Sequence, residues 1–311
     1  MEYISTGKII KEFRERRKLS QLQLCEGLCE PPSLCKIETG KQNPNKKLLD
    51  ALAAKLQIPI ALNVPVTRIE FERAQIEREI VRHISMGDYN IYSLLEQYDA
   101  VHSNMDRLEK QFYLFASSVY ESFVKNDFLS ALKGFMESIQ ITFSSYKIGM
   151  DISGHLFIPI EITLLNNIAI CLNRLERQDE AVELQKQLLS CLEHIGLETE
   201  EYARKFPMIS YNLSTWLGMA GCLEESLSVA EKGIECCLNY ERYSNYSRLL
   251  YNKGYTLMLL KRISEGKEFI KKSLVQMISF EDKKYFKKAK EDIIESFGIS
   301  FWNEISTIHL P

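Results

Sequence analysis

Residues 19–40, LSQLQLCEGLCEPPSLCKIETG, decide the fold of the first part of the chain. Ser20 suits the N-cap of a short helix, because its hydroxyl can accept a hydrogen bond from an unpaired N–H group of the first turn. Pro31 and Pro32 suit the first turn of a second helix, where a missing N–H group costs little. Gly40 suits the end of that helix, since glycine readily adopts the left-handed backbone conformation found there. The stretch therefore predicts two short helices separated by a turn.

The apolar residues of both helices follow helical spacing. Leu24 and Leu28 share one side of the first helix, and Leu34 and Ile37 share one side of the second. The tight turn between the helices is predicted at residues 27–29, which begin with a glycine. Two helices joined in this way form a helix-turn-helix, whose second helix enters the major groove of DNA.

Five side chains of this motif are predicted to contact double-stranded DNA. Gln21 begins the first helix and is placed near a phosphate. Pro32, Ser33 and Lys36 lie on the outward side of the second helix, and Lys41 follows that helix. Outward side chains of such a helix contact base edges, and lysine also binds phosphate.

The N-terminal part closely resembles the Xre family of DNA-binding domains. The resemblance rests on three segments: LSQLQL at 19–24, LCKIETGKQNP at 34–44 and LLDALAAKLQI at 48–58. It implies a five-helix helix-turn-helix domain, which we place at residues 1–65. Many relatives carry polar, base-reading side chains where this chain has two prolines, so we expect Ser33 and Lys36 to carry more of the base reading.

The charge distribution agrees with a DNA-binding domain at the N-terminus. Residues 1–65 hold 11 Lys and Arg against seven Asp and Glu, a net charge of +4, whereas residues 66–311 hold 28 against 35, a net charge of −7. A basic domain can approach phosphate, and an acidic one is repelled by it. No apolar run reaches the roughly 18 residues of a membrane-spanning helix, and the N-terminus has no secretory pattern. We therefore expect a cytoplasmic protein with no membrane partner.

Most of the eight cysteines are expected to be buried, unpaired thiols rather than metal ligands. They stand at positions 25, 29, 35, 171, 191, 222, 236 and 237, and no histidine lies near the first three. A zinc site requires closely spaced Cys and His pairs, which this sequence lacks. Free thiols also agree with a reducing cytoplasm.

Residues 66–311 are expected to form an all-helical repeat domain, joined to the first by a hinge at residues 59–67, PIALNVPVT. Three similar segments begin at Leu164, Ser210 and Leu250. Each has an early Asn, an apolar run, a polar turn and then Glu followed by a small residue. The pattern predicts a superhelix of degenerate tetratricopeptide-like helix pairs.

The repeated asparagines are the candidate ligand-binding residues. Asn166, Asn212 and Asn252 occupy equivalent places in three first helices, where helix propensity disfavours asparagine. An amide both donates and accepts, so a row of amides could bind the backbone of an extended peptide. The alternative is that each Asn caps a helix or bonds a neighbouring turn.

A helix-turn-helix domain, a proline-containing hinge and a long array of helical repeats resemble the RRNPP group of peptide-pheromone-responsive regulators from Gram-positive bacteria. The resemblance covers essentially the full chain. It implies a homodimer that binds paired DNA half-sites and a short signalling peptide, which Asn166, Asn212 and Asn252 would hold by its backbone. Residues 68–110 and 276–311 match no motif of the group.

No enzyme is expected. The five histidines are scattered, and the sequence has no phosphate loop, no nucleophile motif, no metal-binding spacing and no sign of a cofactor. The sequence therefore predicts a transcription regulator that senses an oligopeptide. Two alternatives are a helical-repeat scaffold for another protein and a phage- or plasmid-type repressor that needs no ligand.

Overall fold

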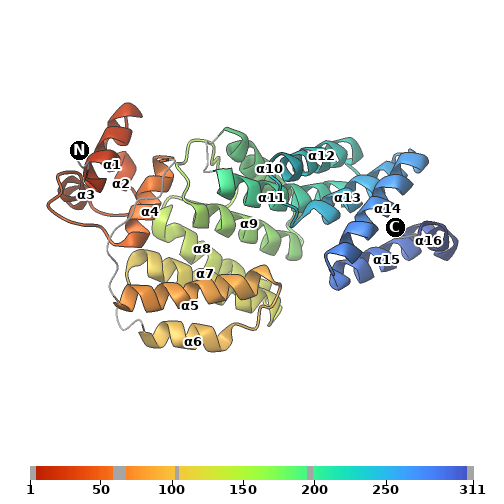
Figure 1. Ribbon diagram of the computed structural model, residues 1–311, viewed down its shortest axis with the longest axis horizontal. Coiled ribbons are helices and arrows are strands. Elements are labelled where there is room, and N and C mark those ends of the chain that lie inside the picture. Colours follow the sequence, from red (N-terminus) through yellow and green to blue (C-terminus); the bar gives the residue numbers. More distant parts are fainter. Residues whose placement is uncertain (1–4, 59–67, 102–104, 195–198, 307–311) are drawn as a thin grey trace. The chain divides into compact units, whose positions relative to one another are not determined.

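The computed structural model describes residues 5–58, 68–101, 105–194 and 199–306. This described part contains sixteen α-helices and no β-strand, so the predicted all-helical fold class is confirmed (Figure 1). The first eight helices are α1 (Thr6–Arg16), α2 (Gln21–Cys25), α3 (Pro31–Glu38), α4 (Lys46–Lys55), α5 (Arg68–Ser85), α6 (Tyr92–Val101), α7 (Arg107–Phe123) and α8 (Phe128–Thr142). The other eight are α9 (Pro159–Arg174), α10 (Gln178–His194), α11 (Thr199–Met219), α12 (Leu223–Asn239), α13 (Tyr246–Leu259), α14 (Ile263–Ser279), α15 (Lys283–Phe297) and α16 (Ile299–Ser306).

Residues 5–58, which we call the head, form the helix-turn-helix as the sequence predicts. Ser20 Oγ accepts a hydrogen bond from the N–H of Gln23 at 3.1 Å, and Gln23 Oε1 accepts one from the N–H of Ser20 at 2.8 Å. This reciprocal cap fixes the start of α2. Pro31 and Pro32 occupy the first turn of α3, and Gly40 follows α3 with a φ of +72°. The head contains four of the five helices expected for this domain, and residues 59–67, the predicted hinge, lie outside the described part.

Residues of all four helices share the core of the head. Ile10, Leu24, Leu34, Leu49 and Leu52 are each 0% exposed. Helices α1 and α3 also approach closely, since a Cβ atom at residue 7 would lie 1.9 Å from the carbonyl oxygen of Ile37. Only glycine fits at that point of α1.

Beyond the head, the helices form antiparallel pairs. The second helices of the three predicted repeats are α10, α12 and α14, and α7 and α8 form a further pair. Small residues permit close pairing: a Cβ atom at Gly254 of α13 would lie 2.9 Å from the carbonyl oxygen of Gly266 of α14. In the pair α11 and α12, Ser226 Oγ donates to the carbonyl oxygen of Ser214 at 2.8 Å.

The chain divides into two compact units, one reaching Leu188 and the other beginning at Leu189. In the second unit, α16 covers the last helices. Its Trp302 and Ile305 are 8% and 0% exposed, and they pack in one cluster with Leu274 of α14 and Ile293 of α15. Helix α16 therefore caps the last helices of the repeat domain.

The head belongs to the first unit and packs directly on α7, α8 and α9. Ile158, just before α9, belongs to the core cluster of the head, and Leu108 and Ile160 pack against the same cluster. The backbones of the head and of α8 approach closely at Gly27. Its φ is +74°, and a Cβ atom there would lie 1.9 Å from the carbonyl oxygen of Thr142. The turn of the helix-turn-helix therefore rests on the end of α8.

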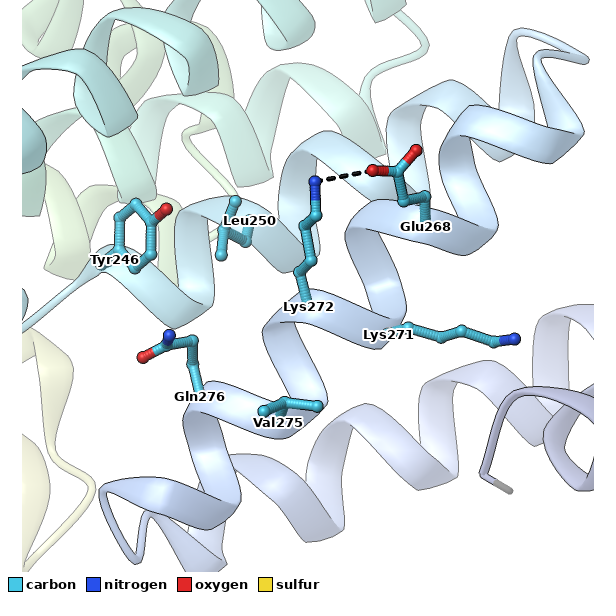
Figure 2. Close-up of a pocket in the computed structure, with 7 residues that line it drawn as sticks. All are labelled: Tyr246, Leu250, Glu268, Lys271, Lys272, Val275 and Gln276. Carbon is cyan, nitrogen blue, oxygen red and sulfur yellow. Dashed lines mark hydrogen bonds and ion pairs between the residues drawn. The ribbon is translucent and has the colours of Figure 1, made fainter. Parts of the chain in front are cut away.

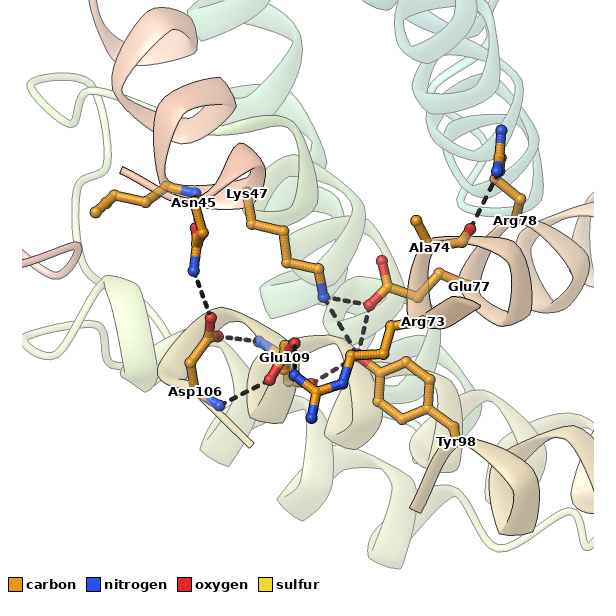
Figure 3. A network of polar contacts seen from close by, with 10 residues as sticks. Asn45, Lys47, Arg73, Ala74, Glu77, Arg78, Tyr98, Asp106 and Glu109 are labelled. Atoms are coloured by element: carbon orange, nitrogen blue, oxygen red, sulfur yellow. Dashed lines mark hydrogen bonds and ion pairs between the residues drawn. The ribbon is translucent and has the colours of Figure 1, made fainter. Parts of the chain in front are cut away.

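A polar network makes a second contact between the head and the helices that follow it (Figure 3). Lys47 of α4 forms an ion pair with Glu77 of α5, and the hydroxyl of Tyr98 donates to the same carboxylate at 2.5 Å. Asn45 Nδ2 donates to Asp106 Oδ2, which lies 3.0 Å away at the N-cap of α7. Tyr98 is 0% exposed, and its burial, followed by the nearby Glu77 carboxylate, raises the pKa of its hydroxyl.

Candidate functional site

The recognition helix α3 presents three of the five predicted DNA contacts on its outer side. Pro32 and Lys36 are exposed and Ser33 is half-buried, whereas Leu34 and Ile37 on the inner side are 0% and 1% exposed. The fourth predicted contact, Lys41, is exposed beyond the end of α3.

The fifth predicted contact, Gln21, lies half-buried and has a structural partner. Its Nε2 atom donates to Glu38 Oε2 at 2.7 Å. Glu38 is 4% exposed and is paired twice with Arg14: Nε to Oε1 is 2.6 Å and Nη2 to Oε2 is 2.9 Å. Burial opposes ionisation of Glu38, but the hydrogen bonds from Arg14 and Gln21 outweigh burial and lower its pKa. The group joins α1, α2 and α3, and so holds the recognition helix in place.

The three predicted peptide-binding asparagines differ in their surroundings. Asn166 of α9 is 2% exposed, and its Oδ1 atom accepts a hydrogen bond from Gln185 Nε2 of α10 at 2.9 Å. Asn212 of α11 is half-buried. Asn252 of α13 is half-buried and lines a cavity. Asn166 belongs to the first compact unit and the other two to the second.

The amide nitrogen of Asn252 binds helix α11. It lies 2.8 Å from Ser214 Oγ, 2.8 Å from Thr215 Oγ1 and 3.2 Å from the carbonyl oxygen of Tyr211. The donor side of this amide therefore helps to hold α13 against α11. Its carbonyl oxygen has no hydrogen-bond partner among the described residues and can accept from a ligand.

The cavity beside Asn252 has a volume of about 70 Å³ and lies entirely within the second unit. Helices α11, α13, α14 and α15 supply its walls, which consist of Tyr211, Thr215, Arg248, Tyr251, Asn252, Met277, Tyr285, Lys288, Ala289 and Asp292. Three tyrosines give it an aromatic character, and three charged side chains stand around them. The sequence identified Asn252 as a candidate, but it did not indicate α15, which matched no motif.

Two polar atoms of this cavity are buried without a hydrogen-bond partner among the described residues: the hydroxyl of Tyr251 and Nε of Arg248. The Arg248 guanidinium lies 3.4 Å from the ring centroid of Tyr285, and its Nη2 atom lies 3.3 Å from Asp282 Oδ2. Burial raises the pKa of the Asp292 carboxyl and of the Tyr251 hydroxyl. Buried polar groups normally have partners, so a polar ligand group or a water molecule would satisfy these two atoms.

A second cavity, of about 360 Å³, lies between α13 and α14 (Figure 2). Leu250, which is 3% exposed, lines it together with Tyr246 and Val275. Lys272 Nζ donates to Glu268 Oε1 at 2.6 Å at its edge. This cavity contains none of the predicted asparagines.

Three further features of the described part concern its thiols, its possible metal ligands and its helix lengths. None of the eight cysteines, all of which lie in the described part, forms a disulfide; five of them are buried, and Cys35 and Cys222 are exposed. No group of three or more potential metal ligands occurs within the described ranges. No described helix combines the length and the apolar character that crossing a membrane requires.

Comparison with known proteins supports the assignment of the head. Residues 10–63 match the family model named Helix-turn-helix. A comparison of the whole sequence with curated proteins finds no match. The N-terminal part is therefore a helix-turn-helix DNA-binding domain.

Solved structures share the fold of nearly the whole chain. PlcR of Bacillus thuringiensis in complex with the peptide PapR7 and DNA is similar with a TM-score of 0.61 and 22% identity, over 92% of this chain and 98% of that one. Apo PlcR is similar with a TM-score of 0.58 and 18% identity, over 93% and 98%. A Rap protein complexed with Competence and Sporulation Factor gives 0.50 and 12% identity, over 97% and 78%. The chain thus resembles RRNPP regulators in fold along almost its entire length, as the sequence predicts.

Proposed function

We propose that this protein is a transcription regulator whose repeat domain binds a short signalling oligopeptide, and that the peptide changes its affinity for operator DNA. The helix-turn-helix match supports the DNA-binding half. PlcR, which has this fold, was crystallised with a peptide and with DNA, and this supports the sensing half. Residues 1–65 would bind DNA, and residues 66–311 would bind peptide and dimerise.

The peptide proposal rests on one observation: buried polar atoms in the wall of the cavity beside Asn252 lack hydrogen-bond partners among the described residues. Leaving a buried donor without a partner costs roughly 1–3 kcal/mol, and a ligand that supplies the partner recovers that free energy. The Tyr251 hydroxyl and Arg248 Nε are such atoms, and both residues line the cavity together with Asn252. A peptide offers carbonyl oxygens and N–H groups at regular intervals, so it can satisfy several of them together. Asn212, in the same unit, remains a further proposed contact, whereas Asn166 is buried in the first unit and accepts a hydrogen bond from Gln185.

Coupling to DNA requires that the peptide bind two states of the protein with different affinities. We place those states in a homodimer that presents two heads to paired half-sites about one helical turn or more apart. Light scattering at micromolar concentration should give twice the chain mass without DNA. A monomeric mass would contradict the dimer.

Replacing Tyr251 by phenylalanine should weaken peptide binding without harming the fold. The hydroxyl has no hydrogen-bond partner among the described residues, so its removal leaves no stranded group there and the melting temperature should stay constant or rise. A lost neutral hydrogen bond to the ligand costs about 0.5–1.5 kcal/mol, which corresponds to a roughly two- to tenfold loss of affinity. Calorimetric titration with the best binder from a library of short synthetic peptides would measure this loss.

Tyr246→Phe is the matched control, because Tyr246 is on the same helix and lines the other cavity. It should leave peptide affinity unchanged. If both variants bind the peptide like the original protein, the cavity beside Asn252 is not the site. A loss seen only with Tyr246→Phe would move the site to the larger cavity.

A further inference from the structure

The exposed side of the recognition helix carries few hydrogen-bonding groups. Pro32, Cys35, Lys36 and Thr39 are its exposed residues. Spacings of three and four residues place Pro32 beside Cys35 and Lys36 on one face of α3. Side chains on this face of a recognition helix meet base edges in the major groove.

The chemistry of these four side chains limits what they can read. The proline ring has no donor or acceptor, and a thiol is a weak one. Thr39 Oγ1 already donates within α3, 2.8 Å from the carbonyl oxygen of Cys35 and 3.2 Å from that of Lys36. Among these four side chains Lys36 is the one strong donor to a base, and Thr39 Oγ1 keeps only its acceptor capacity. The central part of the face, Pro32 and Cys35, is therefore apolar.

The major groove offers one apolar feature, the C5-methyl group of thymine. We propose that Pro32 and Cys35 contact thymine methyl groups and that this contact, together with Lys36, determines which half-site the head selects. The proposal rests on the proposed DNA-binding function. It replaces the expected reading by Ser33 with apolar contacts, and it explains how a helix that begins with two prolines can still distinguish bases.

Uracil substitution tests the contact, because uracil lacks only the C5-methyl group. Duplexes would first be selected from a randomised pool with the full-length protein. Each thymine of the selected half-site would then be replaced by uracil in turn. Burial of one methyl-sized group contributes about 0.8 kcal/mol, so the affected positions should lose about fourfold in affinity.

Variants of the protein show which residue contacts each thymine methyl group. With Cys35→Ser or Pro32→Ala, the ratio of thymine to uracil affinity should fall toward one at the position that each residue contacts. Lys36→Ala should weaken both duplexes equally and leave that ratio unchanged. The melting temperature of each variant shows that the head is still folded.

The outcomes separate this inference from the function on which it rests. A selected half-site without thymine, or uniform binding of thymine and uracil duplexes, would overturn the methyl contact while DNA binding stands. Retention of the full ratio by both Cys35→Ser and Pro32→Ala would also overturn it. Failure to select any duplex would refute DNA recognition itself and this inference with it.

Discussion

Replacing Arg14 by methionine is expected to destabilise the head by about 3–5 kcal/mol, because it leaves the buried Glu38 carboxylate without its charge partner. The two side chains are 10% and 2% exposed and form two hydrogen bonds with each other. Gln21 alone cannot neutralise the charge. Thermal or denaturant unfolding, followed by circular dichroism, would measure the loss.

Arg16 provides the matched control on the same helix. It pairs with Glu12 at 2.5 Å, but the two side chains are 68% and 50% exposed. Exposed pairs contribute at most about 1 kcal/mol, so Arg16→Met should change stability little. Equal effects of Arg14→Met and Arg16→Met would contradict the structural role assigned to the buried pair.

The buried pair of Arg14 and Glu38 makes the stability of the head depend on pH. The pKa of Glu38 is lower in the folded protein than its ordinary value of 4.5. The ionised carboxylate therefore contributes stability that is fully present above pH 4.5 and is lost as the pH falls through the folded pKa. Glu38→Gln should lack this acid-side loss, which unfolding curves at several pH values between neutral and acidic would reveal.

Replacing Gly27 by alanine should separate the head from α8. Its φ of +74° costs an alanine about 1 kcal/mol, and the new Cβ atom would lie 1.9 Å from the carbonyl oxygen of Thr142. Backbone cannot move as easily as a side chain, so overpacking adds roughly 1–3 kcal/mol. We expect a total loss of about 2–4 kcal/mol, together with faster hydrogen exchange at the end of α8.

Gly40→Ala distinguishes the conformational cost of a positive φ from the steric cost of a close contact. Its φ is +72°, nearly the same, but no atom lies within 4 Å of a Cβ atom placed there. Gly40→Ala should therefore cost only the conformational part, about 1 kcal/mol, and should not change hydrogen exchange at α8. If the two alanine variants have the same stability, the contact between Gly27 and Thr142 does not hold the head.

The elements that the sequence predicted well are those governed by local chemistry. Ser20, Pro31 and Gly40 specify the limits of α2 and α3 through hydrogen bonds and backbone preferences within a few residues. The repeats were visible because each helix must bury one apolar side and each turn needs polar residues. Pairs without the repeated pattern, such as α5 with α6, were not assigned.

Side-chain roles were harder to predict because they depend on distant partners. The asparagine pattern drew attention to Asn252, but the pattern could not show that its amide nitrogen binds α11 or that α15 completes the cavity. The equivalent Asn166 instead bonds Gln185 inside a helix pair. Likewise, the role of Gly27 depends on Thr142, which lies more than 100 positions away. Such contacts depend on tertiary packing, and the spacing of residues along the sequence does not reveal it.

The central claim is that one chain couples DNA binding to a peptide held in the repeat domain. Its most direct test is the dissociation constant of the full-length protein for a selected duplex, measured at fixed salt without and with a saturating peptide from the short-peptide library. A coupling free energy of about 1–3 kcal/mol predicts a change of roughly five- to 150-fold, and Tyr251→Phe should require more peptide to reach it. An identical dissociation constant with and without a peptide that demonstrably occupies the cavity would contradict the account.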